Sequence, residues 1–476
     1  MTLDRRDFIK GAMGASGAFV LSGARGFPRW SVPPTEHQRR GTLPPPERSG
    51  IEHVVVVMME NRSFDHILGW LPGADGRQAG LSYATSDGTR HRTFHQPQLN
   101  GCGFKDPDHS YEGGRIQYSG GRMDGFLVDT ENDSFAISYY KPHDRPFMAR
   151  LAQRYTTCDR YFCSILGPTY PNRFFQHTAS TDRLSNTLTA STLPTIWDRL
   201  NQPGGPTGRY YYSDVPFVAL LGAKYLSISS KLADFERDAA AGTLPNVSFV
   251  DPSFIGEDNA TANDDHPLCD LRAGDAFLSQ VFHAVASGPK WANTVLVINY
   301  DEWGGFFEHV PARRVTAAVP IGADPHTGID QDLDARGRVL TGFRVPCIVA
   351  SPLARSRYGG GHVDHGFYDH TSVLKLIEWR WNLAPLSARD ASTAPTDPGN
   401  LANALSFRAP DTRVPDLPLL EFTPTACAAP PTAAPATATE ALVGAGGSAR
   451  GVAAPSLAGR EDWVALRHSN LCAGWS

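Results

Sequence analysis

The chain has 476 residues, of which 41% are hydrophobic and 20% charged, and its formal net charge is -5 at pH 7. This is an ordinary globular composition, and the length suits either two or three average domains or one large α/β domain with long insertions. The acidic balance argues against a nucleic-acid partner, because proteins that bind nucleic acid normally carry a basic patch or stripe.

The first 25 residues have the features of an export signal. The sequence "RRDFIK" at residues 5–10 precedes "GAMGASGAFVLSGA", an uncharged stretch too short and too weakly apolar to span a bilayer. The arginine pair and its flanking residues resemble the twin-arginine signal, which serves proteins that are exported already folded. Chance pairing of arginines is the alternative reading. We expect the twin-arginine translocon as a partner, and a location in the periplasm, in the cell envelope or outside the cell.

The rest of the chain divides into four parts by composition. Residues 26–48 are rich in Pro, Arg and Gly and are expected to be a linker. Residues 49–423 contain the segments that predict strands and helices, and are expected to form the folded domain. Residues 424–460 are an Ala/Pro/Thr/Gly tract without periodicity, which predicts disorder. Residues 461–476 contain two tryptophans and are expected to dock on the folded domain.

Apolar, β-branched runs predict the buried strands of a sheet. They are "HVVVVMM" at residues 53–59, "TVLVINYDEWGG" at residues 294–305 and "VPCIVASPL" at residues 345–353. Amphipathic stretches predict helices at residues 146–155, 273–286 and 371–383. Strands that alternate with amphipathic helices are typical of an α/β domain with three layers, α/β/α, around a mostly parallel central sheet.

Polar side chains follow two of these strands directly. Glu60 and Asn61 come after the first strand, and Asp301 and Glu302 come after the second. Ligands of open α/β sheets bind beyond the carboxyl ends of the strands, so the four side chains are expected to converge there. Three converging carboxylates repel one another unless a cation lies among them. We therefore expect one or more divalent metal ions, and the residues leave Ca²⁺, Mg²⁺, Mn²⁺ and Zn²⁺ open.

The segment "CSILGPTYPNRFFQHTAS" at residues 163–180 contains a candidate nucleophile. Prolines at positions 168 and 171 force a turn around Thr169. A hydroxyl on a rigid turn beside a metal ion can attack an electrophile, because the cation lowers the pKa of the hydroxyl. Judged from this turn alone, the favoured role of Thr169 is to cap a helix that begins near Pro171.

Loops and turns also carry histidines close to carboxylates. The loop "KDPDHSYEGG" contains Asp106 and His109, and the loop "NDDHPLCD" contains His266. A lone loop histidine is more often a solvated surface group. Beside a carboxylate that orients the ring and raises its pKa, each can hold a phosphate oxygen or protonate a leaving alcohol. His309 and His370 share the acid–histidine pattern, and we expect them to support the site or the fold.

Several blocks, taken in chain order, resemble the phosphoesterase family. They are "VVVVMMENRSFDHILGW", "GPTYPNRFF", "DHP", "YDEWGGFFEHV", "VPCIVASP" and "FYDHTSVLKLIEW". The resemblance covers about residues 50–385, and its most specific pieces are ENRSFDH and DE-x-GGFF-x-HV. This family contains bacterial and plant non-specific phospholipases C and some bacterial acid phosphatases. It belongs to the alkaline-phosphatase-like superfamily, so the resemblance implies an alkaline-phosphatase-like fold.

The resemblance also implies roles for individual residues. The metal ligands would be Glu60, Asn61, Asp301, Glu302 and Thr169. Thr169 would also be the nucleophile, which reverses the role inferred from its turn alone. The residues that contact phosphate and assist the leaving group would be His109 and His266, with Asp106 nearby. We expect supporting or substrate-binding positions at Asn172, Arg173, Trp303, His309 and His370.

Two positions depart from the pattern of the family. Trp303 stands where many relatives carry histidine, and Glu308 replaces a frequent aspartate. The first change is expected to alter a contact around the site or the wall of the pocket. The second is chemically mild.

These residues support three alternative functional hypotheses. The lead hypothesis is an exported phosphodiesterase of the phospholipase C type, which would meet a membrane surface through its lipid substrate. Thr169 would attack phosphorus while His266 or His109 protonates the departing diacylglycerol oxygen. The alternative is an acid phosphatase that acts on phosphate monoesters, because the same site accepts both ester classes. A non-catalytic binding protein of the envelope is the third, and the presence of every proposed ligand argues against it.

Overall fold

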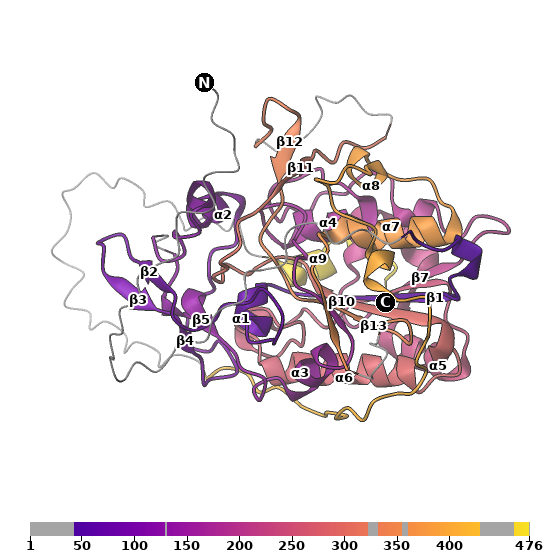
Figure 1. Ribbon diagram of the computed structural model, residues 1–476, viewed down its shortest axis with the longest axis horizontal. Helices are drawn as coiled ribbons and strands as arrows, with labels where there is room; N and C mark the ends of the chain where they lie inside the picture. Colours follow the sequence, from indigo (N-terminus) through magenta and orange to yellow (C-terminus); the bar gives the residue numbers. More distant parts are fainter. Residues whose placement is uncertain (1–41, 129–130, 322–331, 355–359, 429–460, 476) are drawn as a thin grey trace, which may run out of the picture. The chain divides into compact units, whose positions relative to one another are not determined.

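A computed structural model describes residues 42–128, 131–321, 332–354, 360–428 and 461–475 (Figure 1). The expected signal, the expected linker up to residue 41 and most of the tract expected to be disordered, residues 429–460, lie outside the described residues. Among the described residues, no helix combines the length and the apolar character that crossing a bilayer requires.

An eight-stranded central sheet has the strand order β14-β6-β13-β10-β1-β9-β7-β8. The strands are β1 (His53–Met59), β6 (Thr156–Cys158), β7 (Gly208–Tyr212), β8 (Ser229–Lys231), β9 (Val247–Val250), β10 (Thr294–Tyr300), β13 (Cys347–Ala350) and β14 (His362–Asp364). Neighbours in this sheet pair in parallel, except that β13 runs antiparallel to β10 and β6. The predicted mostly parallel sheet is confirmed. The strand predicted at residues 345–353 is shorter than predicted and has the opposite direction.

The apolar run at β1 lies inside this sheet. All seven of its residues are buried, and β1 pairs in parallel with β10 on one side and with β9 on the other. A strand that is apolar on both faces suits this place, because helices cover a mostly parallel sheet on both sides. Met59 pairs with Tyr300, so Glu60 and Asp301 leave the sheet at neighbouring positions.

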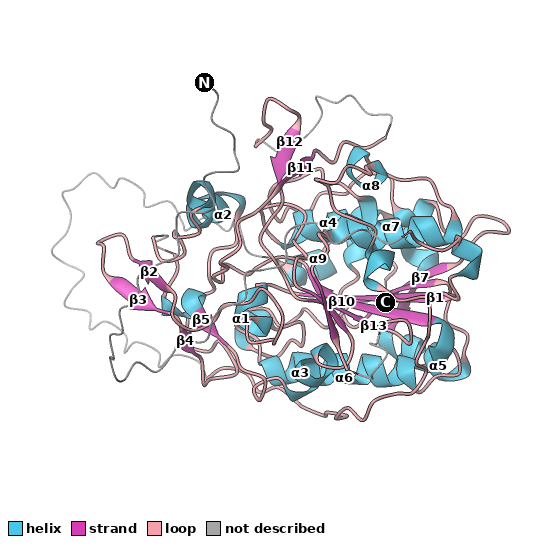
Figure 2. Ribbon diagram, in the orientation of Figure 1, coloured by secondary structure: helices cyan, strands magenta, loops and turns pink. Residues whose placement is uncertain are grey.

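Helices cover both faces of the sheet, which forms the middle of three layers (Figure 2). The helices are α1 (Phe64–Leu68), α2 (Tyr111–Tyr118), α3 (Pro146–Ala152), α4 (Thr169–Thr178), α5 (Leu232–Ala241), α6 (Leu271–Ala286), α7 (His370–Trp381), α8 (Ala388–Ala391) and α9 (Trp463–His468). α3, α5 and α6 pack on one face, and α4 and α7 on the other. The predicted helices correspond to α3, α6 and α7, and the three-layer α/β/α fold class is confirmed.

Short strand pairs and one disulfide complete the described domain. The pairs are β2 (Ser82–Ala84) with β3 (Arg90–Arg92), β4 (Phe94–His95) with β5 (Ser138–Tyr139), and β11 (Arg314–Thr316) with β12 (Arg338–Leu340). The disulfide joins Cys102 to Cys427. It ties the end of the domain to the loop that leads to His109.

Candidate active site

The polar residues that follow β1 and β10 meet at one edge of the sheet. The backbone N–H of Asn61 donates to Oδ1 of Asp301 at 3.0 Å. The backbone N–H of Arg62 donates to the carbonyl of Glu302, also at 3.0 Å. The four predicted side chains are fully buried there: Glu60, Asn61, Asp301 and Glu302. The structure therefore brings together residues that lie 240 positions apart in the sequence.

Two glycines after β10 make this approach possible. Gly304 has a φ of 63° and Gly305 a φ of 69°, which are left-handed backbone conformations. A Cβ atom at Gly304 would lie 2.0 Å from the carbonyl oxygen of Asn61. A Cβ atom at Gly305 would lie 2.6 Å from the Cβ of Pro107. The double glycine thus lets two other segments come close to the tip of β10.

Thr169 directs its hydroxyl toward the same edge. It is the first residue of α4, and Pro168 occupies the N-cap position. Capping, the role suggested by the turn alone, is therefore not the role of this side chain. Oγ1 of Thr169 lies 3.4 Å from Oδ1 of Asn61 and also donates to the carboxylate of Glu461. The side chain is fully buried.

Asn172 holds the turn that precedes Thr169. Its Nδ2 donates to the carbonyls of Ile165 at 3.1 Å, Gly167 at 2.8 Å and Pro168 at 3.2 Å. Its Oδ1 accepts the backbone N–H of Ile165 at 3.1 Å. Because both polar groups of Asn172 are used within the turn, this residue positions the backbone of Thr169.

A buried arginine lies among the carboxylates. Nε of Arg173 donates to Oε1 of Glu60 at 2.9 Å and lies 3.3 Å from Oδ2 of Asp301. One terminal nitrogen of Arg173 donates to Asp251 at 3.3 Å. Arginine stays protonated in proteins, so this charge offsets part of the repulsion between the converging carboxylates. A metal ion is thus not the only cation that can balance them.

The remaining carboxylate oxygens fit a divalent cation. Among the described residues, Oε2 of Glu60 and Oε1 of Glu302 have no hydrogen-bond partner. Burial raises the pKa of both side chains well above the usual value, and it raises the pKa of Asp301 to about 6. Buried carboxylates in this condition stay ionised near neutral pH only beside positive charge, and oxygen ligands are those that hard divalent ions prefer. The ligand set predicted from the sequence therefore fits such an ion.

A second group of carboxylates adjoins the first through Glu60. Ligand atoms of Glu60, Glu257 and Asp264 lie within 4.8 Å of one another. Burial raises the pKa of Glu257 well above the usual value and that of Asp264 to about 6. Sequence reasoning missed Glu257. It lies in the turn-rich segment "IGEDNA", where no pattern distinguishes it from a surface residue.

His109 and His266 lie close together at this edge, with ring centroids 6.1 Å apart. Nδ1 of His109 donates to the carbonyl of Pro107 at 2.8 Å, and its Nε2 lies 3.3 Å from Nδ2 of Asn61. Nε2 of His266 lies 3.7 Å from Oδ2 of Asp106. Burial lowers the pKa of each ring, but nearby carboxylates outweigh it and raise both pKa values, that of His109 strongly. Both rings can therefore hold a proton near neutral pH.

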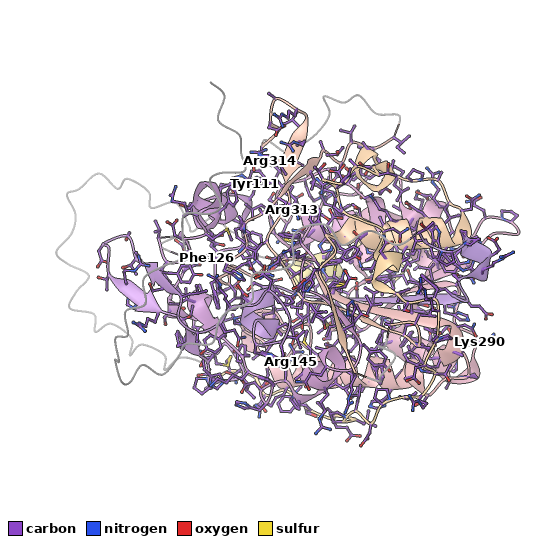
Figure 3. The ribbon with its side chains drawn as sticks, in the orientation of Figure 1. Tyr111, Phe126, Arg145, Lys290, Arg313 and Arg314 are labelled. Atoms are coloured by element: carbon purple, nitrogen blue, oxygen red, sulfur yellow. A yellow bond between two sulfur atoms is a disulfide. The ribbon has the colours of Figure 1, made fainter. Side chains whose placement is uncertain are left out.

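Buried arginines hold the loop that carries His266. Nε of Arg62 donates to the carbonyl of Asp265 at 2.6 Å, and a terminal nitrogen donates to that of His266 at 3.0 Å. Arg145, labelled in Figure 3, pairs with Oδ2 of Asp265 at 2.6 Å. The arginine of the ENRSFDH block thus fixes the position of a histidine that lies about 200 residues further on.

Trp303 and His370 support the tip of β10. Nε1 of Trp303 donates to Oε1 of Gln117 at 2.6 Å, and the indole is fully buried. Nε2 of His370 donates to the carbonyl of Asp301 at 2.7 Å. Burial lowers the pKa of His370 to about 4, so this ring is neutral. His370 thus holds the backbone carbonyl of Asp301, and Trp303 holds the side chain of Gln117.

His309 lies in a different ion network. Its Nδ1 lies 2.5 Å from Oδ2 of Asp65, and its Nε2 lies 3.3 Å from Oδ1 of Asp75. Arg344 pairs in the same network with Glu308 at 2.6 Å and with Asp65 at 3.3 Å. This network connects α1 to the segment after β10, so His309 supports the fold.

We expect protonated His309 to stabilise the protein until the pH approaches 9. Burial lowers the pKa of His309, but Asp65 and Asp75 raise it from the usual 6.5 to about 9. Because the folded protein binds this proton more tightly than the unfolded chain does, protonation stabilises the folded state. The stabilisation is complete below pH 6.5 and is lost as the pH rises through 9. This shift corresponds to about 3 kcal/mol. Urea unfolding should show a gap between wild type and His309→Gln that is larger at pH 7 than at about pH 9.5. An equal gap would contradict this role.

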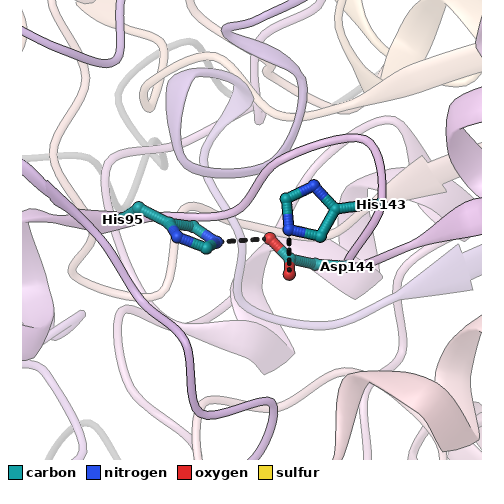
Figure 4. Close-up of side chains that lie close together, drawn as sticks. All are labelled: His95, His143 and Asp144. Atoms are coloured by element: carbon teal, nitrogen blue, oxygen red, sulfur yellow. Dashed lines mark hydrogen bonds and ion pairs between the residues drawn. The ribbon is translucent and has the colours of Figure 1, made fainter.

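A further cluster of metal-ligating side chains lies on β4 and on the loop before α3. Nε2 of His95 is 2.8 Å from Oδ2 of Asp144, and Nε2 of His143 is 3.4 Å from its Oδ1 (Figure 4). Asp144 also accepts the backbone N–H of Lys141 at 2.7 Å. No residue predicted for the site belongs to this group. Measurements of metal content must separate this cluster from the carboxylates after β1 and β10.

Glu461 adds a carboxylate from the end of the chain. Its Oε1 lies 3.4 Å from Nε2 of His109, and its Oε2 lies 3.5 Å from Nε2 of His266. The side chain is 1% exposed. Sequence reasoning missed this residue too, because no motif in the last segment connects it to the strand tips.

Comparison with known proteins assigns the chain to a family. The chain matches the model of the Phosphoesterase family over residues 51–384. It is 33% identical over 379 residues to non-specific phospholipase C1 of Arabidopsis thaliana, covering 72% of this chain and 69% of that protein. It is 29% identical over 482 aligned positions to phospholipase C B of Mycobacterium tuberculosis, covering 86% of each.

The likeness to solved structures is weak. A protein of the alkaline phosphatase superfamily from Vibrio parahaemolyticus aligns with 68% of this chain and 71% of its own, with 13% identity and a TM-score of 0.32. The family assignment rests on the sequence match, which spans the strands, turns and loops of the site. The chain belongs to the phosphoesterase family and is a hydrolase of phosphoric esters.

Proposed function

We propose that this protein is an exported, metal-dependent phosphodiesterase of the phospholipase C type that uses Thr169 as its nucleophile. The observation that carries the proposal is the place of the Thr169 hydroxyl. It is buried on the first turn of α4, 3.4 Å from Oδ1 of Asn61. The two histidines close to it have raised pKa values. Relatives named phospholipase C, which match most of this chain, support a phospholipid substrate.

The proposed reaction is an in-line displacement at phosphorus. The Thr169 hydroxyl loses its proton to solvent as Oγ1 forms a bond to phosphorus and the bond from phosphorus to the glycerol oxygen breaks. His266 or His109 gives a proton to the departing diacylglycerol oxygen, because nearby carboxylates raise the pKa of each ring and so favour its protonated form. Water then hydrolyses the phosphothreonine, which releases the phosphorylated headgroup and restores the hydroxyl.

The carboxylates after β1 and β10 would hold the divalent ion. The proposed ligands are Glu60, Asn61, Asp301, Glu302 and Thr169. When bound, such an ion lowers the pKa of a nearby hydroxyl and offsets the charge of phosphoryl oxygens. Arg173 keeps two of these carboxylates in place through its contacts with Glu60 and Asp301. Its charge also favours an anionic substrate at this edge.

Export is part of the proposal. The arginine pair near the N-terminus suggests it, and the disulfide between Cys102 and Cys427 supports it. Disulfides persist mainly in oxidising compartments outside the cytosol. The protein would then meet membranes through its lipid substrate.

Incubation with vesicles of mixed phospholipids tests the function. We expect diacylglycerol and a phosphorylated headgroup as products, identified by mass spectrometry, and we expect a chelator to stop their release. Phosphate release from p-nitrophenyl phosphate, without diacylglycerol from lipid, would indicate a phosphomonoesterase instead. That result would overturn the phospholipid assignment.

A further inference from the structure

The carboxylate of Glu461 lies among four hydrogen-bond donors. Its Oε1 accepts the hydroxyl of Thr169 and, at 2.8 Å, Nδ2 of Asn186. Nε2 of His109 lies 3.4 Å from Oε1, and Nε2 of His266 lies 3.5 Å from Oε2. A hydroxyl, an amide N–H group and two imidazole nitrogens thus surround this carboxylate, and an ionised carboxylate accepts from such donors.

In the proposed reaction, a phosphoryl group would contact the same donors. The hydroxyl must meet phosphorus, and the histidines must contact its oxygens or the leaving oxygen. Carboxylates and phosphates accept similar charge-assisted hydrogen bonds from such groups. Glu461 therefore lies where the phosphoryl oxygens of a substrate would lie.

Aromatic packing holds the segment that carries Glu461. The ring of Trp463 stacks on Phe254 with centroids 4.1 Å apart and lies 5.1 Å from the ring of Tyr170. Trp463 is 3% exposed, and the guanidinium of Arg173 lies 5.9 Å from its ring. Figure 1 accordingly shows α9 beside α4. Tyr170 and Arg173 belong to the helix that begins at Thr169, so the segment is anchored on the site itself.

We propose that residues 461–475 are an internal ligand of the phosphoryl-binding site, in which the Glu461 carboxylate competes with the substrate. The proposal rests on the proposed function for the identity of that substrate. It also assigns Asn186 as a contact of the phosphoryl group. Oδ1 of Asn186 accepts the backbone N–H of Tyr170 at 2.8 Å, which leaves Nδ2 to face the bound anion.

The contacts favour competition over a permanent catalytic role for Glu461. The carboxylate accepts the hydroxyl of Thr169 and so covers the oxygen that must reach phosphorus. Two anions among the same donors repel each other, so Glu461 and a phosphoryl group exclude one another. The segment is part of the same polypeptide, so its binding is intramolecular and gains from a high effective concentration.

Binding of inorganic phosphate to the full chain tests this proposal. If the segment is docked about nine-tenths of the time, Glu461→Gln should bind phosphate about tenfold more tightly, because the competent fraction scales the apparent affinity. The KM for lipid should fall by the same factor, with kcat unchanged. Glu421→Gln is the matched control, because it removes the same charge from an exposed position.

Two further variants test the roles of Trp463 and Asn186 separately from that of the Glu461 carboxylate. Trp463→Ala removes the anchor but keeps Glu461, and it should also strengthen phosphate binding. Adding Asn186→Ala to Glu461→Gln should weaken phosphate binding again, by about tenfold, as expected for one hydrogen bond to a charged group.

Calorimetry of phosphate binding requires no turnover, so the two proposals can fail separately. If wild type cleaves lipid but Glu461→Gln and Glu421→Gln bind phosphate equally, the internal-ligand proposal is wrong and the function stands. If Glu461→Gln binds phosphate more tightly but no variant cleaves lipid, the internal ligand stands and the substrate assignment is wrong. Loss of both metal and kcat in Glu461→Gln would make this residue a metal ligand and would also overturn the proposal.

Discussion

Thr169→Ala is expected to lower kcat/KM for phospholipid hydrolysis by at least about 10⁴-fold, because it removes the attacking oxygen. The hydroxyl bonds to Asn61 and Glu461 at the site rather than capping α4, so the helix should form without it. Diacylglycerol release from vesicles, followed by mass spectrometry, measures the effect. Thr169→Ser keeps a hydroxyl and should keep most of the rate.

Thr178→Ala provides a matched control in the same helix. Oγ1 of Thr178 donates to the carbonyls of Phe174 and Ser180 at 2.9 and 2.7 Å, at the other end of α4. The same loss of a threonine hydroxyl should therefore leave kcat/KM close to wild type. If Thr169→Ala kept full activity with unchanged metal content, the proposed nucleophile would be wrong.

Asp301→Asn is expected to lower both the metal content and kcat/KM, the latter by about a thousandfold. That factor corresponds to a cation that supplies about 4 kcal/mol of transition-state stabilisation. Oδ1 of Asp301 accepts the backbone N–H groups of Asn61 and Glu302 at 3.0 and 2.7 Å. Asparagine can keep these two bonds through its Oδ1, and it loses the charge together with the ion pair between Oδ2 and Arg173. The backbone of the strand tips should therefore keep its shape. Elemental analysis by mass spectrometry measures the metal beside the rate.

His143→Ala controls for metal bound elsewhere. It removes a ligand from the cluster of Figure 4 and leaves the carboxylates after β1 and β10 intact. Metal lost in this variant without a change in rate belongs to that cluster. Full metal content and full activity in Asp301→Asn would instead show that Asp301 is not a ligand of the metal ion.

The central part of the site follows from sequence patterns that have a direct structural meaning. An apolar run that ends on polar residues predicts a buried strand with a functional tip. Two such strands in one parallel sheet end on the same edge. The two strands are therefore expected to bring four side chains together, and the structure confirms it for Glu60, Asn61, Asp301 and Glu302. The turn around Thr169 and the loops with His109 and His266 reach the same edge, while the proposed roles of these residues stay predictions.

Other residues of the site cannot be recognised from their own sequence segments. Contacts with residues far along the chain produce no periodicity and no characteristic spacing in the segment that carries the side chain. The contacts of Arg173 with Glu60 and Asp301 are one example, since an arginine after a turn can equally face solvent. Glu257 and Glu461 are others.

Local patterns in the sequence predict the class of fold, the polar residues at the strand tips and the family, because hydrophobic periodicity and short motifs are local properties. Tertiary packing alone sets the direction of β13, the place of Arg173 among the carboxylates and the contact of Glu461 with Thr169. Each of these depends on how segments far apart in the chain pack against one another. Burial makes the charged contacts important for stability, because a charge removed from water is destabilising unless the fold brings a partner of opposite charge or a hydrogen-bond partner to it.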